Sequence, residues 1–466
     1  MTPNAPWDYR RALEELWNRS SYERGLITDP FGDTARAERG LARMRALLAL
    51  LGDPQLRYPT VHIAGSKGKG STGAFISSAA TQAALRVGFY TSPHLHRFPE
   101  RIAIDGRPLS DFAAAANVVA RTAEDLEAAS PGSAPVSTFE LVTAMAFVAF
   151  ARQGCDLGVI EVGLGGRYDA TNALNPVVTI ITRIDLEHTA VLGTTYGEIA
   201  AQKAGIMRAG VPCVSSPQVS DAQRVIERIA ADVGAPLSIG GRDWRWRGTW
   251  DAFSTVGPWG VWDDLRLGLA GPHQTENACT ALAALQAVNA AGIAIPETAI
   301  RQGLARAEWP ARFERMATMN REVVFDAAHT PAAAAALVET WRDARLPENA
   351  TVILGMGADK SPRAFLEAIG PITGFLIATR AESPRAADPE EIAAIADEMG
   401  IPNDVHPSVA SAVLAAENTA PAPLLITGSL FVAGEGREAF GLAQPDDVWR
   451  ALSEERLSPR ETPPTA

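Results

Sequence analysis

The sequence predicts an α/β protein of two domains, in which mainly parallel sheets are covered by helices. Short apolar segments alternate with amphipathic or Ala-rich helical stretches, a glycine-rich turn follows an early apolar segment, and a fresh series of strand–helix units begins near Glu322. This alternation is typical of parallel sheets, because a parallel neighbour is reached only through a crossover connection. The predicted strands are residues 60–64, 87–91, 157–162, 177–184, 211–215, 323–327, 351–356, 374–379 and 423–427.

The segment from Trp244 to Leu269 differs in composition from the rest of the chain. It carries five of the ten tryptophans and short alternating runs such as Trp244-Arg-Trp-Arg, which predict antiparallel strands. We expect an antiparallel hairpin extension of the first sheet, with the tryptophans packed on the sheet face. A stacking platform for bases is the alternative.

A helix predicted over about 275–291 ends at Gly292, and Pro296 follows. We therefore place a domain boundary near residue 296. This gives an N-terminal domain of residues 1–296 and a C-terminal domain of residues 297–455. The Pro-rich, polar residues 456–466 are expected to be a disordered tail.

Composition excludes several classes of function. A hydrophobic content of 47% and a charged content of 21% are ordinary for a globular protein. No apolar run reaches membrane-spanning length, and the net charge of -12 disfavours a broad nucleic-acid surface. Cys155, Cys213 and Cys279 lie far apart without ligand spacing, as expected of thiols in a reducing compartment. We expect a cytoplasmic protein without a membrane or nucleic-acid partner.

The first predicted strand leads into a glycine-rich turn, and a helix is expected to begin near Lys69. Glycines let successive N–H groups point inward as a concave anion site, and Lys69 adds a mobile positive charge. The spacing departs from G-x-x-x-x-G-K-[ST], since Ile63 occupies the first glycine position and Gly70 separates the lysine from the serine. The turn predicts a nucleotide phosphate site, with a plain tight turn as the alternative. The nucleotide-binding residues expected here are Gly65, Ser66, Gly68, Lys69, Gly70 and Ser71.

Further segments occur in a specific order along the chain. They are Tyr90-Thr-Ser-Pro-His-Leu95, Ser137-Thr-Phe-Glu140, the run from Glu161 to Asn172, His188–Gly193, Gln202–Ile206, Gly271-Pro-His-Gln274, Trp309-Pro-Ala-Arg312, Phe325–His329, Asp359-Lys360, Ser383-Pro-Arg385 and Thr427-Gly-Ser429. Over roughly residues 8 to 440 the chain resembles the folylpolyglutamate synthase / dihydrofolate synthase family, a branch of the Mur ligase superfamily. The run from Glu161 to Asn172 is the most specific piece. The resemblance implies a P-loop ATPase domain followed by a smaller Rossmann-like α/β domain.

The resemblance also implies an ATP-dependent acid–amino-acid ligase. With ATP and Mg²⁺ as cofactors, it would join L-glutamate to the carboxylate of dihydropteroate or of a reduced folate through an acyl phosphate. Members of this family are commonly monomeric. One alternative is a Mur-type ligase for another acceptor, such as a UDP-sugar peptide, although only about sixty residues precede the phosphate loop, too few for a typical extra domain. Another is a non-catalytic nucleotide-binding relative.

The family assigns roles to residues of the first domain. Lys69 contacts the β- and γ-phosphates, and Ser71, Glu140 and His188 bind magnesium. Lys203 is often carbamylated in the superfamily and then binds a second metal. Each has a plainer alternative. Lys69 could be an exposed lysine at the start of the helix, and Ser71 a polar residue of its first turn. Glu140 could be the acid of a capping box, His188 an ordinary hydrogen-bonding residue, since imidazole is not a preferred magnesium ligand, and Lys203 a solvated lysine.

The remaining assigned residues lie near or beyond the boundary. By resemblance, Asn277 reads adenine, Arg312 contacts phosphate, Asp326 contacts the ribose, and His329 belongs to the same pocket. Lys69, His188, Lys203 and Arg312 form the expected catalytic set. Family segments also assign weaker glutamate or loop-positioning roles to Asp359, Lys360, Ser383 and Arg385, and a substrate-side loop to residues 92–94.

The chain departs from the family pattern at several positions. Ser66-Lys67 stands where Thr-Asn is usual, and Thr330 replaces an Asn. Glu187 replaces an Asp before the histidine, and Gln202 replaces a Glu before the special lysine. Lys67 adds a second positive charge beside the phosphates. These departures bear on substrate choice more than on ATP use.

Overall fold

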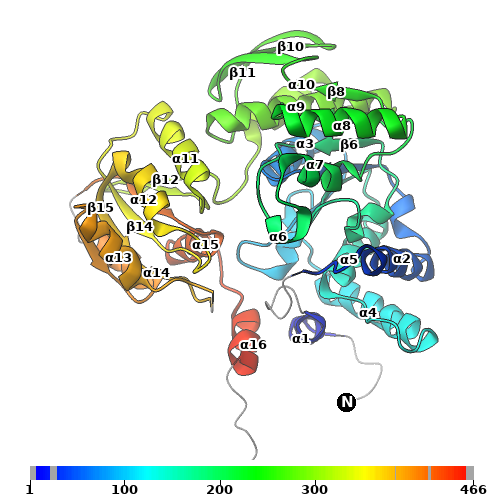
Figure 1. Cartoon of the computed structure of the whole chain (residues 1–466), viewed down its shortest axis with the longest axis horizontal. Coiled ribbons are helices and arrows are strands. Elements are labelled where there is room, and N and C mark those ends of the chain that lie inside the picture. The colour runs from blue at the N-terminus through cyan, green and yellow to red at the C-terminus, as the bar shows by residue number, and fades with distance from the viewer. Residues whose placement is uncertain (1–6, 21–28, 384, 418–420, 458–466) are drawn as a thin grey trace, which may run out of the picture. The chain divides into compact units, whose positions relative to one another are not determined.

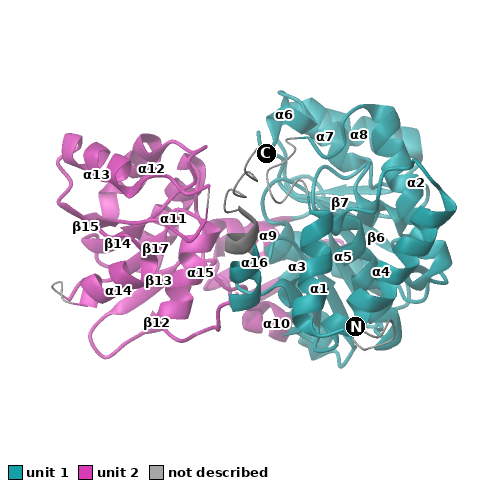
Figure 2. Ribbon diagram, turned by 90° about the horizontal axis from the view of Figure 1, so that it is seen from below, with its two compact units in different colours: residues 1–244, 280–300, 446–466 teal, residues 245–279, 301–445 magenta. Residues whose placement is uncertain are grey.

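The computed structural model describes residues 7–20, 29–383, 385–417 and 421–457 (Figure 1). Contacts divide the chain into two compact units, coloured separately in Figure 2. Unit 1 comprises Met1–Trp244, Thr280–Ile300 and Asp446–Ala466, and unit 2 comprises Arg245–Cys279 and Arg301–Pro445. The domain boundary near residue 296 stays a prediction. Residues 458–466 of the predicted tail lie outside the described residues.

The large sheet of unit 1 has eight strands in the order β4-β3-β2-β5-β1-β6-β7-β8. All five residues of strand β1 are buried, because the strand lies between β5 and β6 and has both faces covered. The pairings from β2 through β8 are parallel, and β3 and β4 extend the sheet in antiparallel fashion. The strands are β1 (Thr60–Ala64), β2 (Val87–Tyr90), β3 (Ile102–Ile104), β4 (Arg107–Pro108), β5 (Leu157–Glu161), β6 (Val178–Ile181), β7 (Cys213–Ser215) and β8 (Leu237–Ile239).

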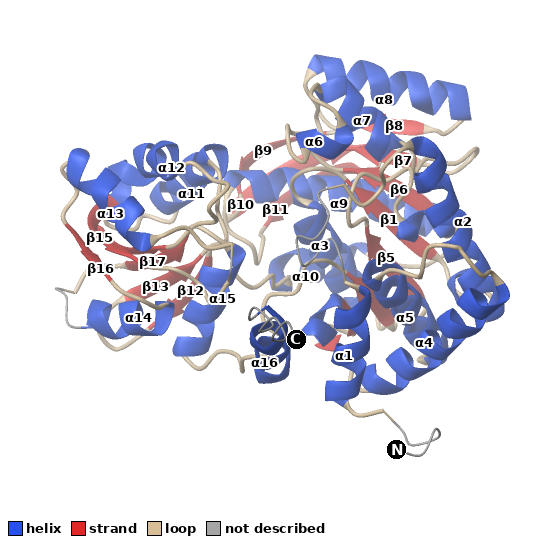
Figure 3. Ribbon diagram, turned by 60° about the horizontal axis from the view of Figure 1, so that its bottom comes forward, coloured by secondary structure: helices blue, strands red, loops and turns tan. Residues whose placement is uncertain are grey.

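Helices lie on either side of this sheet (Figure 3). One buried apolar core joins α1, α2, α4 and α5, and a second joins α7 and α8. The helices are α1 (Tyr9–Arg19), α2 (Thr34–Leu50), η1 (Pro54–Leu56), α3 (Lys69–Gln82), η2 (Phe98–Arg101), α4 (Phe112–Ala129), α5 (Thr138–Arg152), η3 (Ala170–Ala173), α6 (Thr189–Leu192), α7 (Tyr196–Ala204), α8 (Ser220–Val233), α9 (Pro272–Ala290), α10 (Glu297–Arg306) and α16 (Asp447–Leu457).

The Trp-rich segment forms a separate sheet, so its prediction as an extension of the first sheet was wrong. Strands β9 (Arg245–Thr249), β10 (Ala252–Gly257) and β11 (Gly260–Leu265) pair antiparallel in the order β11-β10-β9. Two short turns let these strands satisfy one another's hydrogen bonds, and only a single bridge, between Gly240 and Trp244, connects to the end of β8. Trp244 and Trp262 are buried, whereas Trp246, Trp250 and Trp259 are only partly buried, so packing of all five tryptophans on the sheet face stays a prediction.

Unit 2 contains a six-stranded sheet in the order β12-β13-β17-β14-β15-β16, in which only the β12–β13 pairing is antiparallel. The short strands β12 and β16 at its two edges were not predicted. The elements are β12 (Glu314–Ala317), β13 (Glu322–Phe325), α11 (Pro331–Asp343), β14 (Ala350–Leu354), α12 (Pro362–Ile369), η4 (Gly370–Ile372), β15 (Thr373–Ala378), α13 (Pro389–Glu398), β16 (Asn403–Val405), α14 (Val409–Glu417), β17 (Leu424–Thr427) and α15 (Leu430–Ala439). Each predicted strand overlaps an observed one.

Among the described residues, no helix is both long enough and apolar enough to cross a membrane.

Candidate active site

The glycine-rich loop has the backbone that the sequence predicts. Gly65 follows β1 with φ +152°, and a Cβ there would lie 1.8 Å from Thr182 Oγ1. Gly68 has φ +90° immediately before α3, in the left-handed region that favours glycine. Both positions therefore require glycine, one for close approach and the other for the turn into the helix.

The first half of the loop is anchored to the segment after β6. The N–H groups of Ser66 and Lys67 donate to the Arg183 carbonyl at 2.9 and 3.1 Å, and Ser66 Oγ donates to the Asp185 carbonyl at 3.0 Å. Some of the N–H groups that were expected to point inward at an anion are thus hydrogen-bonded to other parts of the protein. The first N–H groups of a helix lack intrahelical acceptors, so the first turn of α3 is the part suited to an anion.

Lys69 lies at the start of α3 beside a buried carboxylate. Its Nζ donates to the Gly65 carbonyl at 3.0 Å and is 3.8 Å from Glu161 Oε1. Glu161 ends β5, adjacent to β1, and its Oε2 accepts a 2.5 Å hydrogen bond from Thr91 Oγ1. The carboxyl ends of these parallel strands meet at one edge of the sheet, which is where α/β proteins bind ligands. Sequence reasoning gave Glu161 no role, although an acid ending an apolar strand was a usable signal.

Lys203, in the last turn of α7, reaches the same glycine. Its Nζ donates to the Gly65 carbonyl at 2.7 Å and lies 3.9 Å from Glu187 Oε1. The side chain is buried, so the solvated-lysine alternative is wrong. Burial, together with the charge of Lys69, lowers the pKa of Lys203 to about 7, while Glu187 opposes this shift. The amine therefore has a substantial neutral fraction near neutral pH.

This lowered pKa predicts a pH-dependent stability. Between about pH 7 and the ordinary lysine pKa of about 10.4, the unfolded chain binds a proton at residue 203 that the folded chain lacks. The free energy of unfolding should therefore rise with pH across this window, by up to about 1.4 kcal/mol per pH unit from this group. Urea unfolding at pH 7, 8 and 9 in CO₂-free buffer measures the slope. The Lys203→Met variant should show a smaller slope, and equal slopes would contradict the shift.

The Glu187 carboxylate forms ion pairs with two lysines, Lys67 and Lys203. Its Oε2 lies 3.0 Å from Lys67 Nζ, and its Oε1 faces Lys203. Burial raises the pKa of Glu187, but the charges of Lys69, Lys67 and Lys203 outweigh it and hold the pKa below its ordinary value. Two of the departures from the family pattern, Lys67 and Glu187, thus form an ion pair with each other.

His188 lies near the charged side chains of Lys67, Lys69, Lys203 and Glu187, which together form a charge cluster. It has φ +50° immediately before the short helix α6. Burial lowers the pKa of its imidazole, Glu187 raises it, and the three nearby lysines lower it, so that the pKa lies below its ordinary value. The structure therefore brings His188 together with Lys67, Lys69 and Lys203.

Glu140 has the contacts of its plainer alternative. Its Oε2 accepts hydrogen bonds from Ser137 N and Oγ at 2.8 and 2.7 Å, which completes a capping box at the start of α5. Arg43 Nε donates to Oε1 at 3.0 Å and Arg43 Nη2 to Oε2 at 2.8 Å. Both oxygens are thus engaged by protein groups, and a magnesium role for Glu140 stays a prediction.

Two of the predicted residues of unit 2, Asp326 and His329, follow the end of β13. Asp326 accepts the N–H groups of Phe313 and Ala328, each at 2.8 Å, and burial raises its pKa although the Arg312 charge opposes this. His329 Nδ1 lies 2.9 Å from the Ala327 carbonyl. Thr330, a departure from the family, is the N-cap of α11.

Two further predicted groups make local contacts. Asn277 is buried in α9 and donates to Gln274 Oε1 at 3.0 Å. Asp359 and Lys360 form an ion pair at 2.9 Å, and the Arg385 N–H donates to Ser383 Oγ at 3.3 Å. The nucleotide and glutamate roles of these residues stay predictions.

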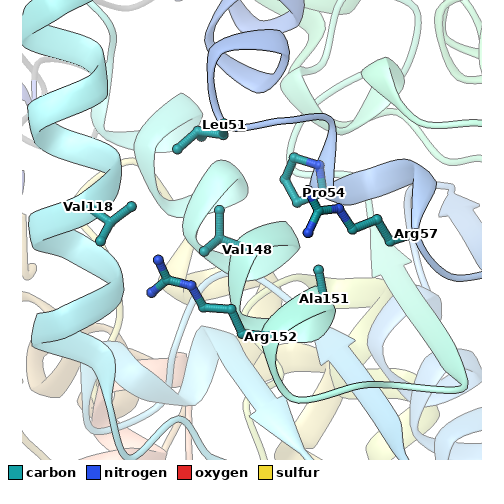
Figure 4. Close-up of a pocket in the computed structure, with 7 residues that line it drawn as sticks. All are labelled: Leu51, Pro54, Arg57, Val118, Val148, Ala151 and Arg152. Carbon is teal, nitrogen blue, oxygen red and sulfur yellow. The ribbon is translucent and has the colours of Figure 1, made fainter.

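A surface pocket of about 180 Å³ lies elsewhere on unit 1 (Figure 4). It is bordered by the end of α2, by η1, and by α4 and α5, close to where strands β1 and β5 begin. Its lining residues are Leu51, Pro54, Arg57, Val118, Val148, Ala151 and Arg152, and none of them is a predicted site residue. The phosphate loop follows the opposite, carboxyl end of β1.

Comparison with known proteins identifies the family of the chain. Residues 311–430 match the glutamate ligase domain of Mur ligases. The chain is 36% identical over 455 residues to a dihydrofolate synthase/folylpolyglutamate synthase of Mycobacterium tuberculosis, covering 87% of this chain and 91% of the relative. It belongs to the folylpolyglutamate synthase / dihydrofolate synthase family. The family, the fold class and the ligase class predicted from the sequence are therefore confirmed.

Solved structures of the family have the same fold. The folylpolyglutamate synthase of M. tuberculosis, complexed with ADP and AMPPCP, matches with a TM-score of 0.80 and 32% identity, covering 93% of this chain and all of that one. Escherichia coli FolC in complex with DHPP and ADP matches with a TM-score of 0.78 and 31% identity, covering 92% and 97%.

Proposed function

We propose that this chain uses ATP to join L-glutamate to the carboxylate of dihydropteroate or of a reduced folate. The acceptor carboxylate attacks the γ-phosphate of ATP, so that an acyl phosphate forms and ADP leaves. The amino group of glutamate then attacks the acyl carbon, loses a proton, and expels inorganic phosphate as the amide forms. Phosphorylation is needed because a carboxylate offers only oxide as a leaving group.

The observation that supports this proposal most directly is the cluster of charges around Gly65. Lys69 and Lys203 both donate to the Gly65 carbonyl, next to the first turn of α3. Lys69 is placed to neutralise charge that develops on the transferred phosphoryl group. Lys67 is paired with Glu187 at 3.0 Å, and Lys69 lies 3.8 Å from Glu161. We propose that Lys69, at the start of α3, is the lysine whose charge faces the phosphates. By the family resemblance, Arg312 contacts phosphate, Asp326 contacts the ribose, and His329 lies in the same nucleotide pocket. We also expect the protein to be a monomer.

The residues of the cluster fit a magnesium ion. Magnesium keeps several waters and is typically held by one or two carboxylates together with substrate phosphates. Glu161 is a buried carboxylate that lies 3.8 Å from Lys69 Nζ and accepts a hydrogen bond from Thr91. Both oxygens of Glu140 are bonded to Arg43 and Ser137. No group of three or more His, Cys, Asp or Glu side chains among the described residues could by itself hold a metal. Because it lies beside Lys69, Glu161 is our proposed carboxylate ligand in place of Glu140, together with Ser71 and His188, the ligands that the family resemblance implies. Bound magnesium would neutralise phosphate charge.

A pair of variants separates the two carboxylates. Glu161→Gln should raise the Mg²⁺ concentration for half-maximal turnover by about tenfold or more, because it removes the negative charge beside the phosphates. Glu140→Gln should leave that concentration unchanged and lower the free energy of unfolding by about 1–3 kcal/mol, through its weakened bonds to Arg43 and Ser137. Turnover titrated with Mg²⁺ and urea unfolding give the two readouts. A raised Mg²⁺ requirement only in Glu140→Gln would instead support Glu140 as the magnesium ligand, the role that the family resemblance implies.

The experiment that tests the function is phosphate release. ATP, Mg²⁺ and L-glutamate are supplied with dihydropteroate, with tetrahydrofolate, or with neither. We expect turnover that requires both glutamate and one pterin acceptor. Glutamate-dependent turnover without either pterin would indicate another carboxylate acceptor, and ATP binding without turnover would indicate a non-catalytic relative.

A further inference from the structure

The last helix of the chain packs on unit 1, although residues 301–445 before it belong to unit 2. Helix α16 lies beside α1 (Figures 1 and 3). Leu452 of α16 is fully buried in the same core as α1, α2, α4 and α5, and Trp449 packs against that core. The chain therefore returns to unit 1 through specific contacts.

One buried carboxylate fastens the start of this helix. Asp446 Oδ2 accepts hydrogen bonds from the Tyr9 hydroxyl and, at 3.4 Å, from Phe98 N, and its Oδ1 accepts the N–H of Trp449 at 3.1 Å. These three donors belong to α1, to η2 and to α16 itself. Asp446 thus ties the C-terminal helix to the short helix that follows the segment Tyr90–Leu95.

Trp449 completes an aromatic cluster at that segment. Its ring centroid lies 4.8 Å from Trp17, 5.0 Å from Phe98 and 6.3 Å from His94, with the last pair edge-on at 88°. The His94 and Phe98 rings are 4.9 Å apart. Edge-to-face pairs at these distances are favourable, and together they restrain a segment that lacks regular secondary structure between β2 and η2.

Further contacts connect His94 with Glu161 and Lys69. Arg101 Nε donates to His94 Nδ1 at 3.0 Å, and its guanidinium lies 4.4 Å from the Phe98 ring centroid. The Arg101 carbonyl accepts the N–H of Thr91 at 3.0 Å. Thr91 in turn donates to Glu161, which faces Lys69. A continuous set of packed and hydrogen-bonded groups therefore leads from α16 to the site.

We propose that α16 is a positioning element for the segment Tyr90–Leu95, which contains the expected substrate-side loop of residues 92–94, and that Trp449 is its main contact. The aromatic cluster holds His94 and Phe98, and Arg101 transmits this placement to Thr91. The aromatic packing contacts this segment directly, whereas it is connected to the phosphate loop only through Thr91 and Glu161. Loss of the packing should therefore affect binding of the pterin acceptor more than binding of ATP. This assignment of the affected substrate depends on the proposed function.

Kinetics of the full-length protein tests this proposal. Trp449→Ala should raise the KM for the pterin acceptor by about fivefold or more and change the KM for ATP by less than about twofold. Trp449→Phe, which keeps a ring in the cluster, should restore most of the acceptor KM. Met44→Ala is the matched control, because it opens a cavity in the same unit 1 core but removes none of the ring contacts of Trp449. All three are compared at a temperature at which circular dichroism shows them folded. Equal changes in both KM values, or an unchanged acceptor KM in Trp449→Ala, would overturn the proposal.

Hydrogen exchange provides a readout that does not depend on the reaction. In the wild type, Leu95 N and His96 N donate to Glu100 at 2.9 and 3.1 Å. Trp449→Ala should speed exchange of these two amides by about tenfold, while Met44→Ala should not. Unchanged exchange in Trp449→Ala would overturn the proposal. If wild-type protein turns over no pterin acceptor, the proposed function fails, and the exchange measurement alone decides the role of α16.

Discussion

Replacing Lys69 with alanine is expected to abolish ATP turnover. Lys69 Nζ donates to the Gly65 carbonyl at the carboxyl end of β1 and lies 3.8 Å from Glu161, in the first turn of α3. Loss of a cation that neutralises a developing phosphoryl charge should lower kcat/KM on the order of a thousandfold. Phosphate release under saturating acceptor and glutamate measures this loss.

Lys67→Asn is the matched comparison, since it removes the neighbouring lysine. The charge of Lys67 is offset by Glu187 at 3.0 Å, so its removal should mainly change the KM for ATP and leave kcat within about threefold. Urea unfolding of both variants establishes that each is folded. Equal losses of turnover would show that the working lysine of the loop has been misassigned.

Replacing Lys203 with alanine should have the second largest effect. We expect turnover to fall on the order of a hundredfold or more, because the buried amine that faces Gly65 is lost. Its pKa of about 7 supplies the neutral amine that must attack CO₂, with release of one proton, to form a carbamate. A carbamate would place an anion within the lysine cluster, able to hold a metal.

Chemical rescue distinguishes a carbamate from a plain amine. Acetate or bicarbonate should restore part of the activity of Lys203→Ala by supplying an anion, and the wild-type peptide containing residue 203 should carry the added mass of a carboxyl group. Lys69→Ala is the control, because it lacks a cation and acetate should not restore it. No added mass together with no rescue would contradict carbamylation.

Several features could be predicted because they depend on local sequence. Gly65 and Gly68 are recognisable because both have positive φ angles, and at Gly65 a side chain would also collide with Thr182, so these positions favour glycine. Strands β1 and β5 are apolar throughout because both faces are buried. The capping box of Ser137 and Glu140 is likewise a local motif, and the structure contains it.

Other features depend on which elements become neighbours. Glu161 faces Lys69 because β5 pairs with β1, although ninety-odd residues separate them. Arg43, which engages Glu140, comes from a helix far earlier in the chain. The Trp-rich strands pair with one another rather than with β8, and the return of α16 to unit 1 left no recognisable local pattern.

The sequence by itself determined the alternating α/β fold, the phosphate loop and the resemblance to a ligase family, since each is carried by residues close together in the chain. Only the tertiary structure decided which carboxylate lies beside Lys69, that Lys203 is buried with a lowered pKa, and that Lys67 is paired with Glu187. The physical reason is that burial and charge pairing depend on strand order and helix packing, which bring together residues that no local pattern connects.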